Sequence, residues 1–483
     1  MQVKLNNKVE LRLQNWKNKA VERGAALRAE KKRSSELIRS RAQHKEKWKQ
    51  EREKRLSYES ELKVIKSELH KLKNHSYDLK TVWVCLAVKN SGTMSLRACR
   101  SAIITLCMCF YIELKVPCIN TIRNWEQKSG FHQLNKRGNS EDKYVIIIDE
   151  SYSIGRQSLL LILGVNLSTY QFGSSLAHQD IEVLGMGVKS SWKSKDIEKL
   201  IATIEQRGYQ IVYSCSDGCN NLVKALKDKG IPRVYDCTHA LSLEIKKRYE
   251  KQERFIAFQK KYALFNRQNY MSQDRLMCPP KLRGKSRFLN IYPMAEWAGK
   301  WIGHLEELEK IKQRDEHEKR MYKKLLWLRD YRALITELVQ VSRILKIVFK
   351  ILKNKGLNTT TIALVRKEVE KAICPVFLRE GILNYLEQNS TLLTDYESLI
   401  CCSDVIESLF GKFKNNQKRN PEKGITIGCL DLINYGQKMD KVTLKKAMEE
   451  TRIIDLKQWR DKNNLQSFNN KRRSLVKKWG NFF

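Results

Sequence analysis

The chain has 483 residues, of which 92 are Lys or Arg and 53 are Asp or Glu, so its formal charge is +39. Hydrophobic residues make up 42%, while Gly (22) and Pro (7) are scarce, which excludes wholesale disorder and the collagen-like and low-complexity classes. A charge this large repels itself unless a polyanion neutralises it, so nucleic acid is the first candidate partner. At about 100–200 residues per domain, the length predicts two to four domains.

The first 80 residues are rich in charged and helix-forming side chains. They carry 23 basic and 11 acidic residues, a net charge of +12, so we expect residues 1–80 to form a basic helical region. Apolar residues in its second half follow the alternating four-three spacing of a coiled coil. These are Tyr58, Leu62, Ile65, Leu69 and Leu72. The spacing predicts dimerisation, with a solvated basic helix as the alternative.

Residues 81–139 are expected to form a helix-turn-helix-like module. Ser95-Leu96-Arg97 opens a first helix, Pro117 precedes a second, and the second helix runs from Thr121 to Gly130. In such modules the second helix presents polar side chains to the base edges of DNA. The candidate DNA-binding side chains are Thr121, Arg123 and Asn124. An ordinary helical hairpin is the alternative.

Short β-branched and apolar runs make residues 140–240 the strand-rich part of the chain. Five strands are expected, at 144–148, 158–167, 181–188, 210–214 and 233–235. Helical periodicity is found between them at 194–207 and 220–229. This order predicts a mixed α/β fold, in which helices flank a mixed sheet.

Residues 241–400 have an almost wholly helical pattern, and aromatic residues are spread among many Lys and Arg. Trp297 and Trp301 are four residues apart, which suits either stacking on an unpaired DNA base or packing in a core at helical spacing. A further helix is expected within residues 401–425, and residues 426–483 form a basic tail. The basic stretch that begins at Lys412 is also expected to bind DNA.

Three acidic residues stand out by their positions. Asp149 directly follows the first predicted strand, Asp217 comes soon after the fourth, and Glu407 lies among apolar residues of the helix expected within 401–425. Carboxylates brought together repel one another, and a hard divalent cation removes that cost. Two Mg²⁺ or Mn²⁺ ions can activate a water or a 3′-hydroxyl and stabilise the leaving oxygen of a phosphodiester. The pattern therefore predicts catalysis on nucleic acid.

Each of these acids alone also has an ordinary interpretation, as a helix cap or a surface charge. Asp217 precedes Gly218 and could belong to a turn. Because the separation between Asp217 and Glu407 is long, Glu397 and Asp404 remain alternatives for the third acid.

The positions of the acids resemble those of DDE transposases with a ribonuclease H-like core. In that family the first Asp is on strand one, the second follows strand four, and the Glu is on a later helix. Asp149, Asp217 and Glu407 match these positions, and Lys414 matches a basic residue that recurs seven residues after the Glu. The stretch Asp236-Cys237-Thr238-His239 resembles the C/DxxH motif of hAT-like and Mutator-like members, whose helical insertion also precedes the Glu helix. The resemblance covers roughly residues 140–420.

The resemblance implies a ribonuclease H-like core with a large all-α insertion at 241–400. Asp149, Asp217 and Glu407 would be both the catalytic residues and the ligands of two Mg²⁺ or Mn²⁺ ions. The candidate supporting residues are Asp236, His239, Asp404 and Lys414. His239 would lie near the active site or the scissile strand, or form a structural hydrogen bond at a helix start. Many hAT members carry an N-terminal zinc finger, and none is recognised here.

We therefore expect a DNA transposase that cleaves transposon ends and transfers the strands to target DNA. Its partners would be terminal inverted repeats, target DNA and further copies of itself, as a homodimer or a higher oligomer. The alternatives are a ribonuclease H-like nuclease without strand transfer and an inactive DNA-binding protein that kept the fold.

Two features bear on where the protein works. No apolar stretch is long enough to cross a membrane, and the start of the chain lacks the apolar segment of an export signal. Thirteen cysteines without zinc-ligand spacing indicate free thiols in a reducing compartment. The expected location is the cytoplasm or nucleoid in a bacterium and the nucleus in a eukaryote.

Overall fold

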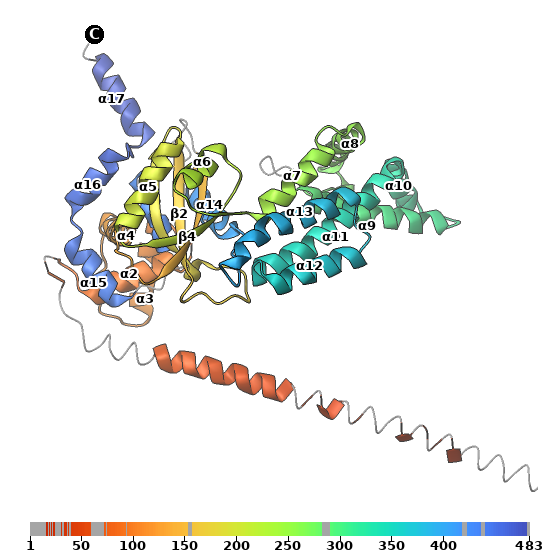
Figure 1. Ribbon diagram of the computed structural model, residues 1–483, viewed down its shortest axis with the longest axis horizontal. Coiled ribbons are helices and arrows are strands. Elements are labelled where there is room, and N and C mark those ends of the chain that lie inside the picture. Colours follow the sequence, from red (N-terminus) through yellow and green to blue (C-terminus); the bar gives the residue numbers. More distant parts are fainter. Residues whose placement is uncertain are drawn as a thin grey trace, which may run out of the picture. The chain divides into compact units, whose positions relative to one another are not determined.

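The computed structural model describes residues 72–73, 75–92, 94–152, 157–282, 290–417, 423–435 and 440–480, together with 40–58 and scattered positions between 16 and 37. The chain forms two compact units, Met1–Lys80 and Thr81–Phe483. In the first unit, residues 40–58 form one exposed helix (Figure 1). The middle of the predicted coiled-coil seam, Leu62 to Leu69, lies outside the described residues.

A five-stranded mixed sheet lies in the second unit, with the strand order β3-β2-β1-β4-β5. The strands are β1 (Lys143–Tyr152), β2 (Ser158–Asn166), β3 (Glu182–Lys189), β4 (Gln210–Ser216) and β5 (Arg233–Tyr235). β2 runs antiparallel to β1 and β3, whereas β4 runs parallel to β1 and β5. All five predicted strands are confirmed. β1 continues beyond its predicted end, so Asp149 is part of the strand.

Helices make up most of the other described residues of this unit (Figure 1). The helices that precede β5 are α2 (Leu79–Asn90), α3 (Leu96–Cys109), α4 (Ile119–Leu134), α5 (Ser194–Gln206) and α6 (Asn220–Asp228). The predicted insertion contains α7 (Cys237–Tyr249), α8 (Glu253–Asn269), α9 (Ile291–Lys310), α10 (Glu316–Leu325), α11 (Arg332–Lys355), α12 (Thr359–Lys371) and α13 (Val376–Ser390). The chain then forms α14 (Asp404–Gln417), the 3-10 helix η8 (Ile427–Asn434), α15 (Lys441–Glu450), α16 (Ile453–Lys462) and α17 (Phe468–Gly480).

Side chains of the central strand β1 alternate between two apolar layers. Ile146 and Ile148 pack with residues of α5 and α6. Val145 and Ile147 belong to the other apolar layer, and α14 packs against β1. A strand covered on both faces needs apolar side chains on both, which explains the unbroken buried run. By the same alternation, Asp149 shares its face with Val145 and Ile147.

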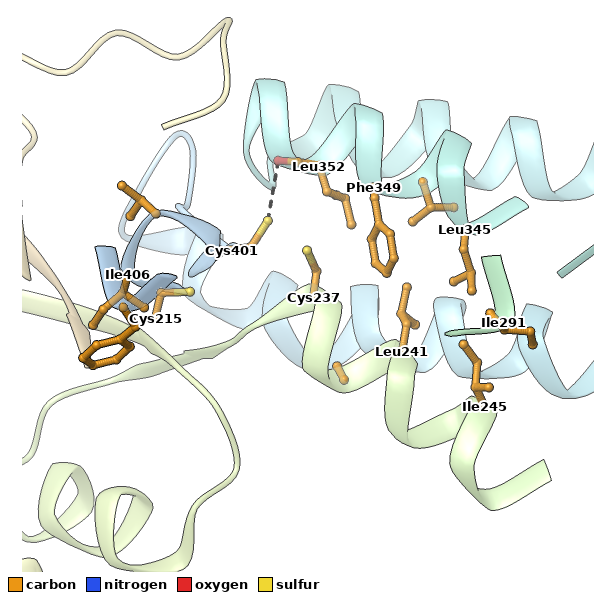
Figure 2. Close-up of a cluster of buried hydrophobic side chains, with 14 of the residues drawn as sticks. Cys215, Cys237, Leu241, Ile245, Ile291, Leu345, Phe349, Leu352, Cys401 and Ile406 are labelled. Atoms are coloured by element: carbon orange, nitrogen blue, oxygen red, sulfur yellow. Dashed lines mark hydrogen bonds between the residues drawn. The ribbon is translucent and has the colours of Figure 1, made fainter. Parts of the chain in front are cut away.

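One apolar cluster joins the sheet to the insertion, and Figure 2 shows part of it. The cluster includes Cys215 of β4, Leu241 and Ile245 of α7, Leu345 and Phe349 of α11, and Ile406 of α14. Cys401, just before α14, directs its thiol to the carbonyl oxygen of Leu352 at 3.7 Å (Figure 2). The insertion and the catalytic helix candidate α14 therefore share a core.

The predicted second helix of the helix-turn-helix-like module is α4, and most of it is buried. Residues 125–130 are all buried, and α4 packs against α3, η8, α15 and α16. Among the three candidate DNA-binding residues, Arg123 and Asn124 are exposed in the first turns, and Thr121 is half-buried. The C-terminal helices cover the later turns of α4, so only its first turns are open to a DNA groove, and DNA reading by Thr121, Arg123 and Asn124 stays a prediction.

Trp297 and Trp301 are core residues of the insertion, with exposed fractions of 6% and 9%. The Trp297 indole N–H donates to the carbonyl oxygen of Met277 at 2.9 Å. The centroids of the Trp297 and Tyr262 rings are 5.1 Å apart. Both tryptophans therefore pack in the core, which is one of the two alternatives that their spacing left open. Stacking of either indole on DNA, the other alternative, would require opening this core.

The predicted basic tail is in large part helical, as α15 to α17. The Lys128 ammonium of α4 donates to the carbonyl oxygen of Met448 in α15 at 2.9 Å. No helix among the described residues is both long and apolar enough to span a bilayer. All thirteen cysteines are free.

Candidate active site

Asp149 and Asp217 are carried to the same edge of the sheet by two parallel strands. Ile148 of β1 is paired with Ser216 of β4, so the next residue of each chain segment is an aspartate. The backbone N–H of Glu150 donates to Asp149 Oδ1 at 2.7 Å. Because β1 and β4 are neighbouring parallel strands, this register brings Asp149, within β1, and Asp217, just after β4, next to each other.

Asp217 also closes a turn, which is the alternative that its sequence context raised. Its Oδ1 accepts a hydrogen bond of 3.0 Å from the backbone N–H of Cys219. Its backbone carbonyl oxygen accepts a hydrogen bond of 3.0 Å from Arg233 Nη1. These two bonds fix the backbone at Asp217. A carboxylate has acceptor capacity beyond one turn hydrogen bond, so the turn and the site interpretation are compatible.

The third acid, Glu407, lies in the first turn of α14. Its side chain is 46% exposed, and its Oε1 lies 3.9 Å from His239 Nε2. Helix α14 packs against β1, which accounts for the approach of Glu407 to the sheet edge. Glu397 is exposed ahead of α14. Asp404 is paired with Lys353 of α11.

Asp236 connects the end of β5 to the start of α14. The fully buried Asp236 Oδ1 caps α7 by accepting the backbone N–H of His239 at 2.8 Å, and it lies 3.1 Å from His239 Nδ1. Its Oδ2 accepts the backbone N–H of Ser403 at 2.5 Å. The Asp236 carboxylate therefore holds both the imidazole that faces Glu407 and the residue that precedes α14. The structural hydrogen bond expected as one role of His239 is present.

The charges of these groups act on one another. Burial is the main cause that raises the pKa of Asp149 to about 7. The carboxylates of Asp217 and Glu407 contribute to the rise, while the hydrogen bond from the Glu150 N–H and the charge of His239 oppose it. The hydrogen bond to Asp236 raises the pKa of His239 to about 9, with further contributions from Glu407 and Asp217. At neutral pH His239 is thus a cation in contact with an acidic cluster.

The remaining sequence candidates lie on or near α14. The Lys412 ammonium lies 5.4 Å from the centroid of the Tyr435 ring, and Lys414 lies 5.8 Å from that of Phe410. Lys353 and the Ser403 backbone were not found by sequence reasoning. Lys353 is one of many basic residues in its helix, and a backbone donor has no sequence signal at all.

The donor chemistry of the three acids suits hard divalent cations, since all their ligand atoms are oxygens. Among the described residues, no group of three or more His, Cys, Asp or Glu side chains is arranged to hold a single metal ion. In a two-metal site, however, the ions are shared among several carboxylates. The pKa of Asp149 is raised chiefly by burial, and the charges of Asp217 and Glu407 add to the rise; bound cations would offset both contributions.

The comparisons with known proteins give a weak structural similarity and no similarity to a family model. No family model matches the chain, and no curated protein matches it. Among solved structures, the fold is similar to that of the Drosophila P element transposase strand transfer complex, with a TM-score of 0.41 and 9% sequence identity. The match covers 83% of this chain and 100% of that one.

Proposed function

We propose that this chain is a DNA transposase of the DDE type, with a ribonuclease H-like core and a helical insertion. The observation that carries the proposal is the convergence of Asp149, Asp217 and Glu407. They come from β1, the end of β4 and α14, and the charges of Asp217 and Glu407 act on Asp149. The strongly basic composition supports a nucleic-acid substrate.

In this proposal Asp149, Asp217 and Glu407 hold two Mg²⁺ or Mn²⁺ ions. Bound ions of this kind activate a water or a 3′-hydroxyl and stabilise the leaving oxygen of a phosphodiester. The protein's own contribution is to fix the acids: β1 and β4 set the two aspartates, and Asp236 sets the start of α14 through Ser403. The protonated His239 beside Glu407 offsets part of the negative charge before the ions bind.

The proposed partners are the inverted repeats of a transposon, a target DNA and further copies of the chain. We assign DNA-end binding to the N-terminal helices and to the basic surface that includes Lys412. Arg123 and Asn124 are exposed in the first turns of α4 and are the candidates for base contacts.

The test uses the DNA that surrounds the gene, where inverted repeats bracketed by a short direct duplication would supply the substrate. With Mg²⁺ or Mn²⁺, the full chain should nick this DNA at the repeat ends and join the ends to a target plasmid. Asp149→Asn and Asp217→Asn should abolish both steps while DNA binding persists. Asp228→Asn, which changes an exposed acid of α6, is the matched control and should leave both steps intact.

Two outcomes would replace this proposal. Cleavage of the repeats without joining of pre-cut ends that carry a 3′-hydroxyl would indicate a nuclease. DNA binding with no metal-dependent nicking would indicate a DNA-binding protein that has lost catalysis. Strand transfer by the Asp149→Asn, Asp217→Asn double variant would remove these acids from the mechanism.

A further inference from the structure

An open pocket of about 870 Å³ adjoins Glu407, between α14 and the insertion. Its wall includes Glu407 and Ser408 of α14, Tyr292 of α9, Lys346 and Lys353 of α11, and Thr238 of α7. The pocket therefore begins at one of the three acids of the candidate active site and extends along helices α9 and α11.

The walls of this pocket are anchored in the hydrophobic core. Phe349 lines it and also belongs to the apolar cluster that joins α7, α11 and α14 (Figure 2). Thr238, also in the wall, follows Cys237 of the same cluster. A site with such walls is formed before any ligand arrives, which lowers the entropic cost of binding.

Two hydroxyl groups of the wall lack hydrogen-bond partners among the described residues. They are the Tyr292 hydroxyl and Thr238 Oγ1, and both atoms are buried. Thr238 as a whole is 7% exposed. Buried polar groups without partners cost free energy, and native proteins retain few of them. A ligand that accepts hydrogen bonds would satisfy both groups.

The residues of two ion pairs also line this pocket. Lys353 pairs with Asp404, and Lys346 pairs with Glu296. Both lysines come from α11, so their ammonium groups line one side of the pocket. Lysine ammonium groups and neutral hydroxyls all donate hydrogen bonds, and a phosphate offers several acceptor oxygens with a negative charge.

We propose that this pocket binds the sugar–phosphate of the nucleotide next to the phosphodiester bond that is cut, on one DNA strand. The inference rests on the proposed function, because only the nearby acids identify the phosphate as part of a nucleic acid. The hydroxyl groups of Tyr292 and Thr238 donate hydrogen bonds to the phosphate oxygens. Lys353 leaves its ion pair with Asp404 and pairs with the phosphate instead. The insertion thereby holds the strand against Glu407.

Tyr292→Phe tests the hydroxyl directly, because it removes one oxygen and keeps the ring. Binding of a fluorescein-labelled single-stranded oligonucleotide by the full chain is measured by anisotropy without divalent ions, so that no cleavage occurs. The affinity should fall roughly tenfold, as expected for loss of one hydrogen bond to a charged group. The Tm of the free protein should stay the same or rise, since the variant no longer buries an unpartnered hydroxyl. Tyr270→Phe, an exposed tyrosine of the insertion, is the matched control and should match the parent protein.

Lys353→Gln tests the charge. It should weaken binding and reduce the slope of log affinity against log salt by about 0.7, the value for one phosphate contact to a single strand. Lys353→Arg should restore the slope. Tyr292→Phe should leave the slope unchanged, since it removes no charge.

Three results would overturn the proposal. The first is equal DNA affinity in the Tyr292→Phe and Tyr270→Phe proteins. The second is a parallel fall of Tm and affinity in Tyr292→Phe, which would make the hydroxyl structural. The third is an unchanged salt slope in Lys353→Gln. Because these assays need no metal and no cleavage, they can fail while Asp149→Asn still abolishes catalysis, and the reverse.

Discussion

The His239 imidazole lies between two carboxyl groups, with Nδ1 3.1 Å from Asp236 Oδ1 and Nε2 3.9 Å from Glu407 Oε1. The first of these partners is fully buried, and it also accepts the backbone N–H of Ser403. One side chain therefore sets both the ring orientation and the entry of the chain into α14. Loss of Asp236 should therefore disturb Glu407 in two ways, through the orientation of His239 and through the position of Ser403 at the start of α14.

Asp236→Ala should lower the free energy of unfolding by about 2–4 kcal/mol, because it leaves buried N–H donors of His239 and Ser403 without an acceptor. Urea unfolding measures the change. The pKa of His239, followed by NMR, should also fall from its raised value of about 9 towards the ordinary range, since the hydrogen bond to Asp236 is its largest cause. An unchanged His239 titration in a folded Asp236→Ala protein would contradict this account.

A buried ion pair attaches α2 to α4. Lys89 Nζ lies 2.9 Å from Glu126 Oε1, and both side chains are almost completely buried. Lys89→Met should lower the free energy of unfolding by about 3–5 kcal/mol, because it leaves the Glu126 carboxylate buried without a positively charged partner. The double variant Lys89→Met, Glu126→Leu should recover most of that loss. Lys319→Met, which breaks an exposed pair with Glu316, should have no measurable effect. Equal losses in the single and double variants would show that packing, not charge, is responsible.

The stretches that sequence reasoning placed well are those whose structure is decided locally. The strands around Asp149 and Asp217 are short apolar runs bounded by polar residues. The helix expected to open at Ser95 is α3, and the Ser95 side chain caps it by accepting from the Ala98 N–H at 3.1 Å. Asp149 lies in β1, Asp217 directly follows β4 and Glu407 lies in α14, while their shared catalytic role stays a prediction.

The failures involve partners that are remote in sequence. The burial of α4 depends on η8 and α15, about 300 residues later in the chain, and no local pattern records that contact. At Trp297 the i, i+4 spacing fitted both a core and a binding face, and only the surrounding rings decide between them. The pairing of Lys353 with Asp404 likewise depends on tertiary packing, not on the spacing of charges.

Asp431 gives a pH dependence whose sign follows from its surroundings. Burial raises its pKa well above the ordinary value, with Glu126 adding to the shift and Lys89 opposing it. A carboxyl group whose pKa is raised in the folded state costs no stability below its unfolded pKa, and it reduces stability as pH rises above that value. Asp431→Asn should therefore gain stability relative to the parent between about pH 4 and pH 8, with the difference growing as pH rises. Urea unfolding across this range measures it, and a difference that shrinks with rising pH would reverse the assignment.

Trp297 should act on stability and not on DNA binding. Its ring packs against Tyr262, Phe265 and Trp327, so Trp297→Ala should cost about 3–5 kcal/mol through the cavity it leaves. Trp48→Ala, in the exposed helix 40–58, is the control for stability and should leave the unfolding transition in place. Under conditions where both variants are folded, the Trp297→Ala protein should bind single-stranded DNA as the parent does. Weaker binding with an intact fold would return Trp297 to the DNA interface.

The exposed first turns of α4 are the remaining place where this helix can read DNA. Arg123 is exposed there, and its Nη1 donates to Asn120 Oδ1 at 2.8 Å, which keeps the guanidinium at the N-terminal end of the helix. Arg123→Ala should lower affinity for the inverted repeats by about 1–3 kcal/mol and lower affinity for unrelated DNA much less, because base contacts discriminate between sequences whereas phosphate contacts do not. Gel-shift competition between repeat and unrelated duplexes measures the two affinities. Lys136→Ala, an exposed cation just beyond the other end of α4, should weaken both equally or neither. If Arg123→Ala also weakens both duplexes equally, the residue contacts phosphate and the sequence is read elsewhere.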